Sequence, residues 1–94
     1  MNLRDIKKDI EYLIGAFVDD CALFLESHPG KNADDIANLV DEAVDLFNSL
    51  RDRVSQAPEK GKKAHYDEIR KELLEKTDAL YDKLSEAVKK GLSE

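Results

Sequence analysis

The sequence predicts an all-α, antiparallel up-down-up three-helix bundle in which residues 1–94 form a single domain. Three observations predict this fold class. Apolar residues recur at steps of three and four, two breaks containing proline and glycine divide the chain, and no segment has the alternation of a strand. A content of 41% hydrophobic and 38% charged residues is typical of one helical domain with a polar surface. We expect helices at about 3–27, 33–56 and 62–90.

The first helix, 3–27, is expected to begin after Asn2 as N-cap, with Asp5 in the first turn, where the helix dipole favours an anion. Its apolar face reads as one stripe that includes Cys21, and a thiol on such a stripe usually packs as a small core hydrophobe. The residues of this stripe are Leu3, Ile6, Ile10, Leu13, Ile14, Phe17, Cys21, Phe24 and Leu25.

The second helix, 33–56, follows a break at Pro29 and Gly30, with Asn32 as the expected N-cap. Its apolar positions alternate steps of four and three, as one buried helix face requires. These positions are Ile36, Val40, Ala43, Phe47, Leu50 and Val54.

The third helix, 62–90, follows Pro58 and Gly61, and Lys89, Lys90 and Gly91 are expected to end it. Its apolar face contains Tyr66, Ile69, Leu73, Leu74, Thr77, Leu80, Tyr81, Leu84 and Val88, and its exposed side carries Glu-to-Lys pairs at Glu72/Lys76 and Glu86/Lys90. Short connections between helices of similar length indicate antiparallel neighbours that share one core. The alternative is an open helical hairpin whose remaining face is closed by a second chain.

This topology argues against the usual catalytic and metal sites. His28 and His65 fall at opposite ends of the bundle, about 35 Å apart by helix rise, so one metal ion cannot use both. Cys21 has no histidine close enough to serve as its base. We therefore predict no catalytic residue, no metal and no cofactor.

Asp19 and Asp20 interrupt an otherwise apolar stretch of the first helix. An unpartnered buried carboxylate costs several kcal/mol, so Asp20, which borders the apolar stripe, is expected to accept a hydrogen bond from Thr77 or Tyr81. A second interpretation makes Asp20, Thr77 and Tyr81 a polar site of an enzyme or small-ligand binder. Arg70 is expected to extend its charged head to Glu11 or Asp45.

A second apolar line, Tyr12, Ala16 and Leu23, lies on the side of the first helix opposite its main stripe. A monomeric bundle has no use for this line, and its small central residue would let another helix approach closely, so it predicts a homodimer contact. The alternative is that the first helix packs centrally and both of its apolar lines are core.

The charge distribution disfavours nucleic acid as a partner. The net charge is −6, although residues 1–9 and 49–66 together hold eight basic against four acidic side chains. A weaker hypothesis is a nucleic-acid-associated regulator that uses the basic end, namely Arg51, Arg53, Lys60, Lys62 and Lys63.

The function predicted is that of a small, non-enzymatic helical protein that contacts other proteins and itself. We expect a cytoplasmic location and no membrane association, because the chain starts without the pattern of a signal peptide and has one cysteine.

Overall fold

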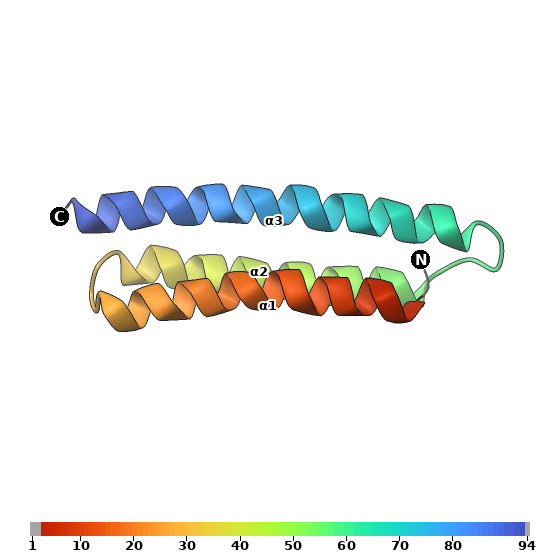
Figure 1. The fold of residues 1–94 in the computed structure, drawn as a ribbon, viewed down its shortest axis with the longest axis horizontal. Helices are drawn as coiled ribbons and strands as arrows, with labels where there is room; N and C mark the ends of the chain where they lie inside the picture. Colours follow the sequence, from red (N-terminus) through yellow and green to blue (C-terminus); the bar gives the residue numbers. More distant parts are fainter. Residues whose placement is uncertain (1–2, 94) are drawn as a thin grey trace.

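Three helices lie side by side along one rod in the computed structural model, which describes the backbone of residues 3–93 and the side chains of residues 5–93 (Figure 1). They are α1 (Leu3–Ser27), α2 (Ala33–Ser55) and α3 (Lys62–Leu92). The rod measures 53 × 17 × 16 Å. All three helices contact one another, which confirms the three-helix bundle and excludes the open hairpin. The expected N-cap Asn2 lies outside the described residues.

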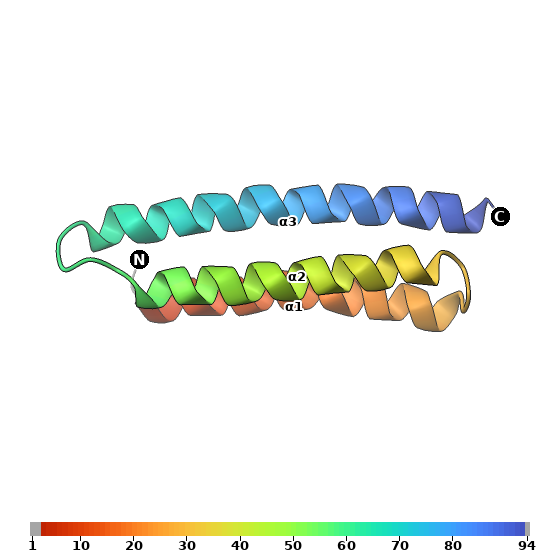
Figure 2. The same cartoon turned by 180° about the vertical axis from the view of Figure 1, so that it is seen from behind.

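The chain runs up, down and up. The start of α1 and the α2–α3 link lie at one end of the rod, and the α1–α2 link and the C-terminus lie at the other (Figures 1 and 2). His28 and His65 are accordingly at opposite ends, as predicted. Within residues 3–93, no helix has both the length and the apolar character needed to cross a membrane.

A continuous apolar core runs the length of the rod. The three helices contribute to it at the three- and four-residue spacing of the sequence, because those positions share one helix face. Its largest fully buried side chains are Phe17, Ile6, Ile10, Ile36, Leu50, Ile69, Leu73, Val54 and Cys21.

The first link closes against the end of α3. Asn32 takes the N-cap position of α2 and accepts a backbone hydrogen bond from Ile36 (3.2 Å), but its side chain makes no capping bond. The backbone of Asn32 is left-handed (φ 53°), and its Nδ2 donates to the carbonyl of Ala87 on α3 (3.0 Å). Asn32 therefore occupies the predicted N-cap position, but the prediction that its side chain caps α2 is wrong. The side chain instead connects the start of α2 to α3.

The sequence predicted that Gly91 ends α3. In the structure Gly91 is buried inside this helix. A Cβ at Gly91 would lie 3.3 Å from the Asn32 Cβ and from the Lys31 carbonyl oxygen. The missing side chain therefore lets α3 continue past the first link to Leu92. At the second link, α2 ends at Ser55, one residue earlier than expected, and Gly61 adopts φ 81° before α3 begins.

Ion pairs show the register of α2 against α3. Among the described side chains, three pairs join these helices: Lys90 with Asp35 (3.9 Å), Lys83 with Glu42 (3.0 Å) and Arg53 with Glu72. The three α2 residues are spaced seven and eleven residues apart. Their partners on α3 have the same spacings in the reverse direction, as antiparallel helices require. Lys90 thus meets Asp35 and not Glu86, its expected partner.

Polar contacts also show the register of the parallel helices α1 and α3. The guanidinium of Arg70 lies 3.6 Å from Asp9, and the hydroxyl of Tyr81 lies 2.9 Å from Asp20. Both pairs join positions 61 residues apart. The expected partners of Arg70 were wrong, because a helical wheel gives the direction of a side chain but not its level on the neighbouring helix.

Candidate functional site

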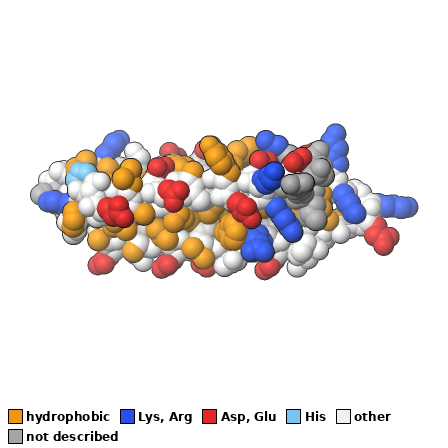
Figure 3. All heavy atoms as spheres, turned by 60° about the horizontal axis from the view of Figure 1, so that its bottom comes forward, with side chains coloured by type: hydrophobic (Ala, Val, Ile, Leu, Met, Phe, Trp, Pro, Cys, Tyr) orange, Lys and Arg blue, Asp and Glu red, His pale blue; other side chains and the backbone are white. Residues whose placement is uncertain are grey.

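Among the described side chains of α1, the most exposed large apolar ones lie on its outer face. Tyr12 is 76% exposed and Leu23 62% exposed, and the half-buried Ala16 lies between them. The alternative in which both apolar lines of α1 are core is therefore wrong for Tyr12 and Leu23. Figure 3 shows hydrophobic side chains exposed between acidic ones along this side of the rod.

Anions lie at both ends of this line, with Asp5 and Lys8 near the start of α1 and Asp19 and Glu26 farther along it. Lys8 precedes Tyr12, whereas Asp19 and Glu26 stand on either side of Leu23, and all three charged side chains are exposed. In the part of the chain with described side chains, neither Lys8 nor Glu26 has an ion-pair partner within 4 Å. Their charges are therefore available to a partner that covers this face.

An apolar hollow of about 320 Å³ adjoins the outer face, between α1 and α2. Gly15 and Val18 line its α1 side, and Val44 and Phe47 line its α2 side. Val44 is exposed, and a cation already lies over the Phe47 ring, with the guanidinium carbon of Arg51 5.5 Å from the ring centre. The apolar surface around α1 thus extends beyond Tyr12, Ala16 and Leu23 to the seam with α2.

The polar group predicted around Asp20 forms only in part. Tyr81 donates a hydrogen bond to Oδ2 of Asp20 (2.9 Å), and its ring packs edge-on against Phe17 with ring centres 5.1 Å apart. Burial, the hydrogen bond to Asp20 and the charge of Asp20 raise the pKa of Tyr81 to about 12. Thr77 is buried and its Oγ1 has no hydrogen-bond partner within the described structure.

This arrangement explains Asp20 as the acceptor for an interhelical hydrogen bond. Of the two donors expected for Asp20, Tyr81 is confirmed and Thr77 is not. The raised pKa keeps the phenol of Tyr81 protonated at neutral pH, so Tyr81 remains a hydrogen-bond donor to Asp20.

Cys21 is completely buried among the core side chains. Burial, together with the negative charge of Asp20, raises the pKa of the Cys21 thiol to about 11. The reactive form of cysteine is the thiolate, which this environment disfavours. The expectation that Cys21 packs as a core side chain is confirmed.

The two histidines make separate local contacts. His65 donates from Nε2 to the carbonyl of Arg53 (2.6 Å) and ties the start of α3 to the end of α2, whereas His28 stacks on Phe24 with ring centres 4.8 Å apart. Within the described residues, no group of three or more His, Cys, Asp or Glu side chains is placed to hold a metal ion.

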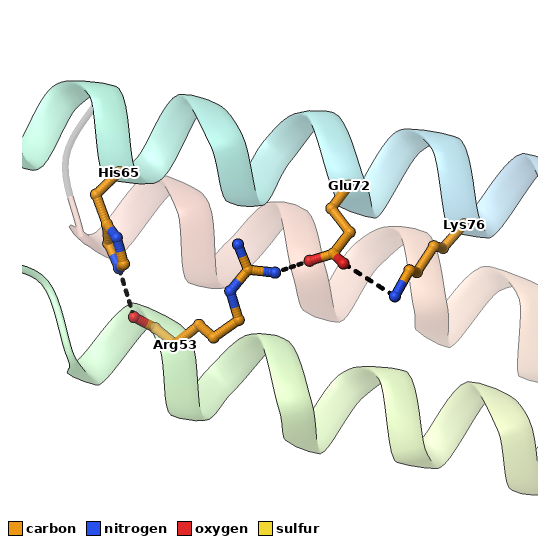
Figure 4. Close-up of polar contacts among 4 residues, drawn as sticks. All are labelled: Arg53, His65, Glu72 and Lys76. Carbon is orange, nitrogen blue, oxygen red and sulfur yellow. Dashed lines mark hydrogen bonds and ion pairs between the residues drawn. The ribbon is translucent and has the colours of Figure 1, made fainter.

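Arg53, one of the residues proposed for a basic nucleic-acid surface, forms an ion pair between α2 and α3. Its guanidinium pairs with Glu72, which also receives Lys76 at 2.9 Å (Figure 4). The four other candidates lie at the same end of the rod: Arg51 covers Phe47, and Lys60, Lys62 and Lys63 are exposed at the second link and the first turn of α3.

The ion-pair ladder between α2 and α3 was missed from the sequence, although its signal is there. Asp35, Glu42 and Arg53 are spaced seven and eleven residues apart, and Lys90, Lys83 and Glu72 show the same spacing with opposite charge. Hollows of about 390 and 560 Å³ flank the Lys83–Glu42 pair, and charged side chains edge both.

Comparison with known proteins returned no relative: no family model matches the chain, and neither a curated protein nor a solved structure matches it.

Proposed function

We propose that this protein is an interaction module that performs no chemistry and associates with a second copy of itself through the outer face of α1. The observation that carries the proposal is the exposure of Tyr12 and Leu23 on one face of a helix whose opposite face already fills the core. We propose that the protein acts in the cytoplasm. Its one cysteine is free and buried, so the fold does not depend on a disulfide or on an oxidising compartment.

The expected association is weak. Burying an exposed leucine or tyrosine side chain contributes about 1.5–3 kcal/mol, and a second copy doubles every contact. Association also costs several kcal/mol of lost translational and rotational freedom. A contact built on two such side chains per copy therefore suits a reversible dimer more than a permanent one.

Sedimentation equilibrium from low to high micromolar concentration tests the proposal. The wild-type chain is expected to dimerise as the concentration rises, and Leu23→Asp is expected to weaken the dimer at least tenfold. Leu92→Asp is the matched control, because Leu92 is 56% exposed on α3, away from the α1 face. A wild-type chain that stays monomeric at high micromolar concentration contradicts the proposal.

A further inference from the structure

We propose that the second copy docks with its α1 antiparallel to this α1, about a two-fold axis level with the peptide bond between Phe17 and Val18. This inference rests on the proposed function and adds to it the orientation and the register. Tyr12 of each copy then packs on Leu23 of the other, and Lys8 of each copy faces Glu26 of the other.

The apolar pair supplies the first argument. Tyr12 and Leu23 are eleven residues apart, about three helical turns, so they share one face and lie about 16 Å apart along the axis. Their midpoint is the level of Phe17 and Val18. An antiparallel copy centred there brings each exposed side chain onto the other, whereas a parallel copy stacks tyrosine on tyrosine and leucine on leucine.

The charges supply a second, independent argument. Lys8 and Glu26 are eighteen residues apart, which is five helical turns, so both lie on the same flank of α1. Their midpoint is Phe17, within half a residue of the midpoint of the apolar pair. In the antiparallel arrangement a cation therefore meets an anion at both ends of the contact, because a two-fold axis perpendicular to the helices keeps both side chains on one flank. In a parallel arrangement like charges share a level, and no lysine lies beside a glutamate.

Small residues in the middle of the contact let the two α1 helices approach closely, but an acidic residue there repels its copy. Gly15 and Ala16 lie next to the axis, and nothing comes within 4 Å of a Cβ added at Gly15. Asp19 also lies near the axis, so the carboxylates of the two copies come close together and repel each other. Asp19→Asn is accordingly expected to tighten the dimer about two- to fivefold.

Charge exchange tests the register. Lys8→Glu and Glu26→Lys are each expected to weaken the homodimer about three- to tenfold, because each change turns two attractions into two repulsions. An equimolar mixture of the two variants is expected to form a heterodimer at least as strong as the wild-type dimer, since every contact then joins opposite charges. Sedimentation of each variant and of the mixture, with one partner fluorescently labelled, measures this.

Disulfide trapping tests the orientation independently. In a Cys21→Ala background, a mixture of Tyr12→Cys and Leu23→Cys is expected to oxidise to a heterodimer. Each single variant alone remains uncrosslinked, because its two thiols lie about 16 Å apart across the axis. Rapid crosslinking of each single variant with itself overturns the antiparallel orientation.

The failures of the two proposals are distinguishable. If Leu23→Asp weakens the dimer but neither charge variant does, self-association stands and the register is wrong. If the wild-type chain is monomeric, both proposals fail. Both proposals also fail if the chain stays monomeric and binds only a lysine-rich amphipathic peptide on the α1 face.

Discussion

The hydroxyl of Tyr81 donates a hydrogen bond of 2.9 Å to Asp20, at the same offset of 61 residues that separates Arg70 from Asp9. Two contacts of different chemistry thus hold α1 and α3 in one register, eleven residues apart on each helix. Asp20, which interrupts an apolar stretch in the sequence, is kept at the edge of the core by a phenol from the neighbouring helix.

Tyr81→Phe is expected to lower the free energy of unfolding by about 0.5–1 kcal/mol, since it removes one partly exposed hydrogen bond and keeps the ring contact with Phe17. Urea denaturation followed by circular dichroism measures the change. The control is Tyr12→Phe, whose hydroxyl makes no hydrogen bond among the described residues. Equal effects of the two changes contradict a structural role for the Tyr81–Asp20 bond.

Alkaline pH is expected to destabilise the fold by ionising Tyr81, whose neutral form is favoured by burial and by the hydrogen bond to Asp20. The pKa of Tyr81 rises from 10 to about 12 on folding, so its contribution to stability is complete below pH 10 and is lost as the pH rises towards 12. The difference in unfolding free energy between the wild-type chain and Tyr81→Phe should therefore shrink over this interval. A difference that stays constant from pH 9 to pH 12 refutes the assignment.

The Cys21 thiol is expected to resist modification in the folded protein. It is completely buried and its pKa is raised to about 11, so at pH 8 very little of it is both ionised and accessible. Ellman's reagent should react slowly with native protein and at once in 6 M guanidinium chloride. Fast reaction under native conditions would show that the bundle opens around Cys21.

Glu72→Gln is expected to cost about 0.5–1 kcal/mol of stability, because Glu72 accepts both Arg53 from α2 and Lys76 from its own helix. Glu75→Gln is the control, since Glu75 is exposed and forms no ion pair among the described residues. A double-mutant cycle with Arg53→Met isolates the interhelical part. A coupling energy of zero would mean that the contact contributes nothing to the α2–α3 register.

Two glycines inside helices are expected to respond differently to alanine. Gly15→Ala should stabilise the monomer by about 0.5–1 kcal/mol, because alanine favours a helix and no atom lies within 4 Å of the new Cβ. Gly91→Ala should gain less or destabilise, since its Cβ would meet Asn32 and the Lys31 carbonyl oxygen at 3.3 Å. Thermal unfolding at low micromolar concentration, where association is negligible, compares them. An equal gain at both positions would show that the first link yields easily.

Much of the fold follows from local patterns, and the errors share one cause. The starts of the three helices and the buried position of Cys21 were predicted because spacing, proline and glycine act within a few residues of the chain. The partner of Arg70, the role of the Asn32 side chain and the continuation through Gly91 depend on which level of one helix meets which level of another. The hydrogen bond of Asp20 could be anticipated because a carboxylate at the edge of an apolar core needs a donor. Tyr12 and Leu23 are exposed in a single copy, so a contact that covers them stays a prediction.

The rod of 53 × 17 × 16 Å has a hydrodynamic consequence. An elongated body tumbles slowly end over end and quickly about its long axis, so amide vectors along the helices and in the two links relax at different rates. Antiparallel docking along α1 would thicken the body with little increase in length, so translational diffusion would slow while the anisotropy of tumbling decreased.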